Sequence, residues 1–292
     1  MKFTLVFLFL TSFSFAQPNT ELYLMDISEN GDSLQITNFK NISNRPGYDN
    51  QPSFIDNTKL VYAGTENDNT EIILYYLESD GQHRLNAPTA GGEYSPQSFP
   101  SKPLVAAVRL DTTGLQRLYS YEYGIPGYGK WKMLFEELEV AYFAFQDDDR
   151  IIASVLSGDK LDLVVGTISK DQALLLTTNT GRSIHRVPSS SSISYTQLNT
   201  EGTYDIYIVD IDDTGESFYV CTLPMGIQDH IWLNNSTLLL GSNDKLFMMD
   251  LFKGTNWFKV ADLSEKNISN ITRMAISPDG KHLAIVAMPQ EK

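Results

Sequence analysis

The amino-acid sequence predicts an all-β protein, specifically a six-bladed β-propeller with four-stranded blades. Three observations predict it. Short runs of Val, Ile, Leu, Phe and Tyr alternate with clusters of Gly, Asn, Asp, Ser and Pro, and few windows show the 3.6-residue period of a helix. This pattern recurs at roughly 40–50 residues, the length of a propeller blade. The two ends of the chain each carry half of one repeat.

The N-terminal residues have the layout of a secretory signal peptide. Lys2 precedes the apolar run from Phe3 to Leu10, and the small residues Ser14 and Ala16 lie just before Gln17. No later apolar stretch reaches the length of a membrane span. We therefore expect residues 1–16 to be a signal peptide cleaved after Ala16. Residues 17–292 would then form a secreted or periplasmic propeller that does not span a membrane.

The clearest repeat unit is a strand that is followed by a turn containing glycine. Because glycine accepts a positive φ and Asp and Asn bond to their own backbone, a hairpin can close at such a turn. In three copies the glycine lies ten positions after the acidic residue that opens the strand, as in Glu21 and Gly31, Glu71 and Gly81, and Asp205 and Gly215. Looser copies bring the count to six, and they begin near residues 117, 160 and 245.

A second unit precedes most of these hairpins and consists of an apolar anchor, a polar turn and another apolar strand. Its best copy is Ile276 before the turn 277–280 and the strand that begins near Leu283. In this turn Pro278 fixes φ and Gly280 supplies the left-handed position. The other anchors are Phe54, Phe99, Phe145, Val187 and Trp232, with second strands that begin near Leu60, Leu104, Ile151, Ile193 and Leu238.

The chain ends predict how the ring closes. Residues 21–39 supply the last two strands of a blade and have no anchor strand before them, whereas residues 271–287 supply only the first two. The last blade is therefore expected to combine strands from both termini. Five continuous blades and this shared blade give six, and the closed circle protects the sheet edges.

At these residues the chain resembles the TolB-like β-propeller repeat. The matching motifs are Pro52-Ser53-Phe54, the turn Ser277-Pro278-Asp279-Gly280, and the strand 205–210 with the sequence Asp-Ile-Tyr-Ile-Val-Asp. The resemblance covers nearly all of residues 17–292 and implies the fold rather than a function. The repeats near residues 145–178 and 187–223 lack the Pro-Asp-Gly turn. TolB itself has a separate α/β domain before its propeller. Because the repeats occupy nearly all of residues 17–292, we expect a free-standing propeller of the same type here.

The charge of the chain restricts its partners. The formal net charge is −14, which argues against nucleic acid as a partner. The loops that join second to third strands are acidic, and we expect them to share a face with the mouth of the channel. A ring of negative charge there could receive a basic peptide or a cation, or the loops could simply be hydrated. These acidic residues are Glu66, Asp68, Asp111, Asp159, Glu201 and Asp244.

The inner strands of a propeller line its central channel, and several polar residues fall within or just before them. His185 and His230 each lie within two residues of an anchor, so they could point into the channel or face the neighbouring blade. Asp49, Asn50, Glu93 and Asp229 could converge as oxygen ligands of calcium, although no metal-binding motif or catalytic motif is present and no cofactor is expected. The candidate channel ligands are Asp49, His185, Arg186, Asp229, His230 and Arg273.

The segment 123–129 is longer than the equivalent turn in other repeats and is rich in Gly and Pro. We expect it to form an exposed loop that contacts a partner through Tyr123, Pro126 and Tyr128. The sequence thus favours a non-catalytic module that binds a protein or peptide over one face of the propeller. The alternative is a propeller that binds a sugar or small molecule in its channel, with metal-dependent hydrolase or lactonase activity as one version of it.

Overall fold

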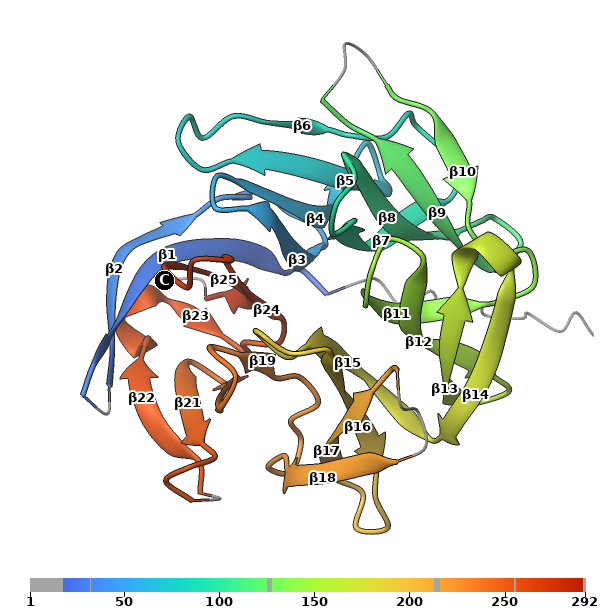
Figure 1. Ribbon diagram of the computed structural model, residues 1–292. Helices are drawn as coiled ribbons and strands as arrows, with labels where there is room; N and C mark the ends of the chain where they lie inside the picture. The colour runs from blue at the N-terminus through green and yellow to red at the C-terminus, as the bar shows by residue number, and fades with distance from the viewer. Residues whose placement is uncertain (1–17, 32, 125–127, 213–215, 255, 291–292) are drawn as a thin grey trace, which may run out of the picture.

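The computed structural model describes residues 18–31, 33–124, 128–212, 216–254 and 256–290. These residues form six antiparallel sheets arranged in a ring (Figure 1), which confirms the predicted propeller. The predicted signal peptide, residues 1–16, lies outside the described residues. Within the described part of the chain, no helix is long and apolar enough to cross a membrane.

Each of the five continuous blades runs outward from its inner strand in chain order. Blade 1 contains β3 (Asp49–Asp56), β4 (Lys59–Glu66), β5 (Asn69–Tyr76) and β6 (Gln82–Arg84). Blade 2 contains β7 (Gly92–Ser98), β8 (Leu104–Leu110), β9 (Gln116–Glu122) and β10 (Trp131–Met133). Blade 3 contains β11 (Val140–Phe145), β12 (Arg150–Ser157), β13 (Lys160–Thr167) and β14 (Gln172–Thr178). Blade 4 contains β15 (Thr180–Arg186), β16 (Ser192–Leu198), β17 (Tyr204–Asp210) and β18 (Ser217–Thr222), and blade 5 contains β19 (Ile231–Trp232), β20 (Thr237–Ser242), β21 (Lys245–Asp250) and β22 (Phe258–Asp262).

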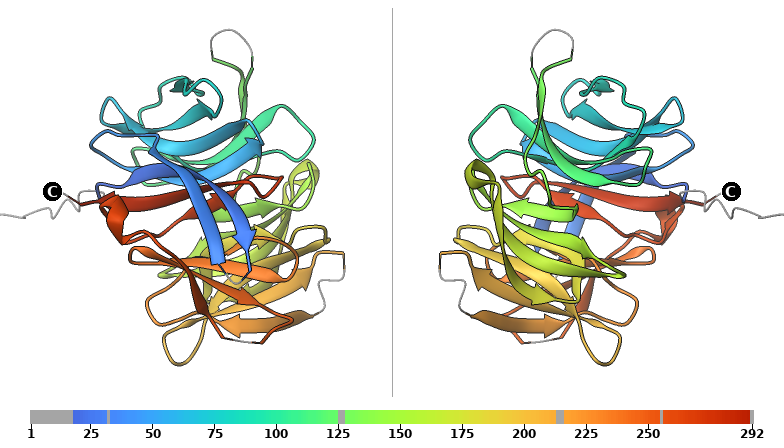
Figure 2. Two further views of the ribbon diagram at one scale, coloured as in Figure 1. Left: turned by 90° about the vertical axis from the view of Figure 1, so that its left-hand side faces the viewer. Right: turned by 90° about the vertical axis from the view of Figure 1, so that its right-hand side faces the viewer.

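Blade 6 is built from both ends of the chain, as predicted. Its order from the inside is β24 (Met274–Ile276), β25 (His282–Pro289), β1 (Glu21–Asn30) and β2 (Ser33–Asn41), with β23 (Ile268–Ser269) pairing the far end of β25. Strand β1 runs antiparallel to β25, with Tyr23 opposite Ile285. Figures 1 and 2 both show the blue β1 beside the red β25. Opening the ring would therefore require breaking a hydrogen-bonded sheet.

The predicted anchor residues pack between blades. Phe99 of blade 2 and Phe145 of blade 3 are each 5% exposed, and their ring centroids lie 4.4 Å apart. Trp232 is 3% exposed and packs in the cluster between blades 4 and 5 that also contains Val187. Burying a large apolar side chain stabilises a fold by roughly 1.5–3 kcal/mol. The anchors therefore hold neighbouring blades together, and this leaves other residues of the inner strands to face the axis.

Candidate functional site: the central channel

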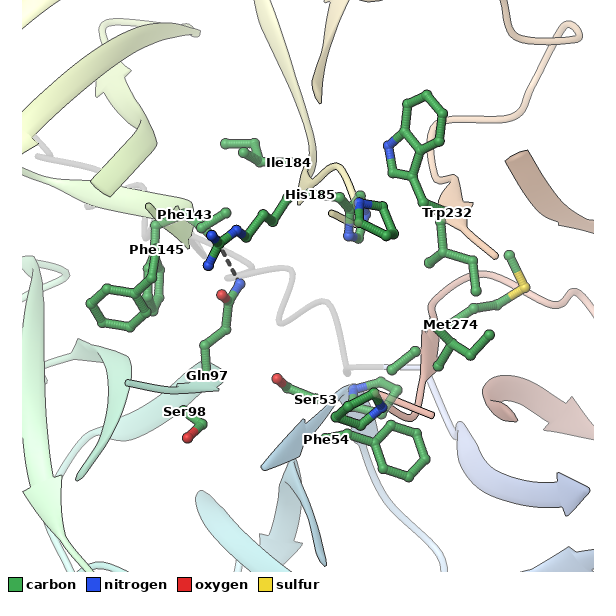
Figure 3. Close-up of a pocket in the computed structure, with 18 of the residues that line it drawn as sticks. Ser53, Phe54, Gln97, Ser98, Phe143, Phe145, Ile184, His185, Trp232 and Met274 are labelled. Atoms are coloured by element: carbon green, nitrogen blue, oxygen red, sulfur yellow. Dashed lines mark hydrogen bonds between the residues drawn. The ribbon is translucent and has the colours of Figure 1, made fainter. Parts of the chain in front are cut away.

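A cavity of about 1050 Å³ lies on the axis of the ring and is lined by residues from all six blades. Figure 3 shows Ser53, Gln97 and His185, from three different blades, placed around it. The lining comes from the inner strands and from the turns that lead to the second strands, where Pro100, Ser189 and Pro278 are exposed. The cavity therefore opens on the face formed by these turns.

The inner end of the cavity is a layer that we call the floor ring. Each inner strand runs toward the mouth, so the first lining residue of each blade lies furthest from it. The floor ring consists of these six residues, which are Gln51, Ser95, Tyr142, Arg182, Asp229 and Arg273.

Asp229 is held between two arginines of the floor ring. The Arg182 Nε lies 3.2 and 3.1 Å from the two carboxylate oxygens of Asp229, and Arg182 Nη2 also donates to this carboxylate. On the other side, Arg273 Nη1 lies 2.9 Å from Asp229 Oδ1. The Arg273 guanidinium also lies 5.0 Å from the ring centroid of Tyr142. Because two guanidinium groups share one carboxylate, the cluster retains one net positive charge.

Irregular backbone places the other floor residues. The pairing of β3 with β4 shifts between Asn50 and Ser53, and that of β7 with β8 shifts between Tyr94 and Gln97. Gln51 and Ser95 lie inside these bulges with φ angles of 55° and 50°. Such left-handed conformations are uncommon for residues other than glycine, and bulges redirect side chains. Here the two bulges contact each other, because the Ser95 backbone amide donates to Gln51 Oε1 at 2.8 Å.

The two predicted channel histidines belong to a buried polar network between blades 4 and 5. Ser183 Oγ lies 3.1 Å from His185 Nε2 and 3.0 Å from His230 Nδ1. On the other side of the ring of His230, Nε2 lies 3.0 Å from Ser194 Oγ, which accepts a 2.8 Å bond from the indole of Trp232. Burial lowers the pKa of His185 to about 4 and lowers that of His230 well below its usual value. Both histidines are therefore neutral at neutral pH.

The structure brings five of the six candidate channel residues together at the cavity. His185, Arg186, Asp229, His230 and Arg273 all line it.

The sixth candidate, Asp49, does not line the cavity. It is 0% exposed and forms a 2.8 Å ion pair with Arg45, and burial raises its pKa. The bulge that follows Asn50 gives the position on the cavity wall to Gln51 instead.

The four residues considered for calcium do not converge. Asp49 pairs with Arg45, Glu93 pairs with Arg109 at 3.0 Å, and Asp229 pairs with the arginines of the floor ring. Asn50, the fourth, is buried with its amide 3.4 Å from Thr20 Oγ1. In the described part of the chain, no three His, Cys, Asp or Glu side chains form a group that could hold a metal ion.

Sequence reasoning missed Gln51, Ser95, Tyr142 and Arg182, although the anchors carried a signal for them. Gln51, Tyr142, Asp229 and Arg273 each lie three positions before an anchor. For Ser95 and Arg182 the interval to the anchor is four and five positions. Aligning residues by their distance from the anchor would have found most of the floor ring.

The predicted contact loop begins near the face where the cavity opens, whereas Tyr128 lies against Arg84 of the outermost strand of blade 1, and Arg84 lies 4.0 Å from Glu66 of a loop on the opposite face. The contact loop joins the third strand of blade 2 to the fourth, and such connections share a face with the turns between first and second strands. Tyr128 is 48% exposed, and its ring lies 5.1 Å from the Arg84 guanidinium. Tyr123 is half-buried near Lys59 in the first turn of blade 1, and burial raises its pKa. Pro126 lies outside the described residues.

The acidic loops between second and third strands lie on the opposite face from the cavity mouth. Successive strands of each blade are antiparallel, so these loops and the cavity-lining turns are at opposite ends of the sheets. None of the six acidic residues named for these loops lines the cavity. The expectation that an acidic ring surrounds the binding mouth is therefore wrong.

No protein-family model and no curated protein sequence matches the chain. Among solved structures, the chain is similar to a putative TolB from Agrobacterium tumefaciens, with a TM-score of 0.66 and 13% identity over 93% of this chain and 98% of that one. A chain of a nidogen/laminin complex gives a TM-score of 0.59 with 10% identity, covering 93% of this chain and 100% of that one. An oligogalacturonate lyase in complex with manganese gives 0.58 with 13% identity, covering 89% and 82%.

These likenesses concern the backbone, because the identities are too low to carry a function. They agree with the ring of six sheets that this chain forms. The chain therefore has the fold of a TolB-like six-bladed β-propeller.

Proposed function

We propose that the chain is a non-catalytic binding module, secreted or periplasmic, that binds a protein or peptide over the propeller face on which the cavity opens. One observation carries this proposal. The cavity, which receives side chains from all six blades, opens on the same face as the exposed Arg186. A recess of this size with an exposed side chain at its mouth suits a partner that covers that face.

The chemistry of the cavity also supports binding. Asp229, the acidic residue of the floor ring, is occupied by ion pairs with two arginines. Ser183 and His230 lie within hydrogen-bonding distance, but each is 0% exposed, so a substrate carbonyl cannot reach this pair. The secreted or periplasmic location follows from the signal-peptide pattern of residues 1–16.

The second candidate is a propeller that binds a sugar or small molecule, with metal-dependent hydrolysis as one version of it. The size of the cavity favours it, because pockets for small molecules have volumes of about 300–1000 Å³. Sugar sites, however, commonly use open aromatic faces. Three of the four aromatic anchors beside this cavity, Phe99, Phe145 and Trp232, are 5%, 5% and 3% exposed and pack between the blades, and the fourth, Phe54, is half-buried.

The test is capture of envelope proteins by immobilised mature protein, residues 17–292. Arg186→Ala alters the face with the mouth and Tyr128→Ala alters the predicted contact loop, and we expect each to reduce capture of the same partner several-fold. Asp159→Ala alters a loop on the opposite face and serves as the matched control. Equal capture by all variants would contradict the proposed face. A stoichiometric divalent ion in the purified protein would instead favour the metal-dependent alternative.

A further inference from the structure

The cavity has a positive charge although the protein is strongly acidic. Its charged lining residues are Arg182, Arg186, Arg273 and Asp229, so three positive charges and one negative charge leave a net charge of +2. The histidines that line it, His185 and His230, are neutral. The whole chain has a formal net charge of −14. A local excess of the opposite sign in a recess attracts a negatively charged ligand.

The two arginines of the floor ring have donors left for a ligand. Arg182 uses Nε and Nη2 on Asp229, and Arg273 uses Nη1 on Asp229 and on the carbonyl of Arg182. Arg182 Nη1 and Arg273 Nε and Nη2 have no hydrogen-bond partner among the described residues. The side chains are 32% and 15% exposed, so they reach the cavity.

Neutral donors lie in the same layer. Ser95 is 9% exposed, and its hydroxyl has no hydrogen-bond partner within the described residues. Tyr142, whose ring centroid lies 5.0 Å from the Arg273 guanidinium, supplies a second hydroxyl to the cavity lining. A buried hydroxyl without a partner costs free energy, and a ligand that accepts its proton removes this cost.

A carboxylate is the ligand group that this layer fits. It accepts several hydrogen bonds, and its bonds to guanidinium groups are charge-assisted. It would also neutralise the positive charge that Asp229 leaves uncompensated. At the mouth, the exposed Arg186 has no ion-pair partner among the described residues and extends the positive lining outward.

We propose that the floor ring binds a carboxylate of a peptide, so that an acidic peptide segment occupies the cavity. This inference rests on the proposed binding function and names the chemistry of the ligand. A peptide is favoured over an acidic sugar because three of the four aromatic anchors, Phe99, Phe145 and Trp232, are buried between blades, and only Phe54 is half-buried at the cavity. The ring of Tyr142 in the floor ring already contacts the Arg273 guanidinium. The carboxylate comes from an Asp or Glu side chain or from a chain terminus, and both are bound through the same arginine donors.

The experiment uses two random octapeptide libraries on beads, one with free and one with amidated C-termini, screened with the mature protein. We expect acidic residues to be enriched among bound beads. Retention only in the free-acid library would assign the chain terminus, and retention in both libraries would assign an acidic side chain. Selected peptides are then resynthesised and their Kd values are measured with each variant.

Arg182→Gln and Arg273→Gln should each weaken binding of the selected peptides at least tenfold. Arg182→Lys retains the positive charge but not the planar guanidinium group, so its Kd should lie between those of the parent protein and Arg182→Gln. Arg117→Gln makes the same change of charge on the outer part of blade 2 and should leave Kd unchanged. Circular dichroism and thermal melting of each variant separate lost binding from lost folding, and only variants that remain folded are compared.

Three outcomes would overturn the inference, and they differ in whether the proposed peptide-binding function also fails. Selected peptides without acidic residues, bound equally by both Gln variants, would refute the carboxylate site and leave the peptide-binding function standing. Arginine-dependent binding of an oligogalacturonate probe with no peptide enriched would make the occupant an acidic sugar and refute the peptide. No binding of either probe would refute both proposals.

Discussion

Asp229 is the residue on which the geometry of the cavity floor depends, because its carboxylate fixes Arg182 and Arg273 from opposite sides. Its side chain is only 9% exposed, so these bonds are largely shielded from water. Removing the carboxylate would leave two guanidinium groups close together with no anion between them. Asp229 therefore offsets the repulsion between the two arginines, which lets both lie in the floor ring.

We expect Asp229→Asn to lower the free energy of unfolding by about 2 kcal/mol, because it removes charge-assisted hydrogen bonds and brings like charges together. Urea denaturation measures this loss. Asp212→Asn is the matched control, since Asp212 is 62% exposed and pairs with Arg150. An exposed pair of that kind contributes less than about 1 kcal/mol. Equal losses in the two variants would show that Asp229 has no special structural role.

The histidine network predicts a loss of stability in acid. His185 has a pKa of about 4 in the folded protein, against about 6.5 in an unfolded chain. Between these values the unfolded state binds the proton and the folded state does not, so stability falls as pH decreases from 6.5 to 4. We expect the slope of unfolding free energy against pH to become shallower in His185→Asn. An unchanged slope in that variant would mean that His185 is not a source of the acid sensitivity.

At the scale of the structural elements, the contact between blades 1 and 2 contains a pair of buried carboxyl groups. Glu71 on β5 is 1% exposed and Glu93 on β7 is 0% exposed. Burial, with Glu93 nearby, raises the pKa of Glu71 to about 7. Glu93 pairs with Arg109 at 3.0 Å, and its partner Glu71 has the raised pKa, so Glu71 retains a proton at mildly acidic pH.

This pair predicts an effect of pH that is opposite in sign to that of the histidines. The folded pKa of Glu71 lies above its unfolded value, so its contribution to stability is full below about 4.5 and is lost as pH rises through about 7. Glu71→Gln imitates the protonated carboxyl group and should be less sensitive to pH between 5 and 7.5. Chemical denaturation at four pH values in this range measures the unfolding free energy. Parallel plots of this free energy against pH for the variant and the parent protein would contradict the prediction.

At the scale of the whole molecule, the pairing of β1 with β25 is the single closure of the ring. Tyr23→Pro removes a backbone donor in the middle of this blade, and we expect the melting temperature to fall by more than 10 °C. Gln172→Pro is the control, because proline is tolerated at the first residue of an edge strand such as β14. Equal melting temperatures for the two variants would mean that closure contributes little to stability.

The sequence by itself determined the blades, their number and their closure. Turns such as 277–280 and strands such as 205–210 are specified by local chemistry, namely fixed or positive φ at the turns and β-branched and aromatic residues in the strands. Their recurrence gives six repeats, and the half-repeats at the two ends predict the pairing of β1 with β25.

Only the tertiary structure decided which residues face the channel and what charge they present. A bulge redirects the side chains within it. Gln51, inside the bulge of β3, therefore lies on the cavity wall, whereas Asp49, just before the bulge, is buried with Arg45. Arg182, Asp229 and Arg273 come from three different blades, and no local sequence pattern predicts that they form ion pairs. For the same reason, the acidic loops evident in the sequence suggested a basic ligand, whereas the assembled ring turned those loops away and placed a positive recess at the mouth.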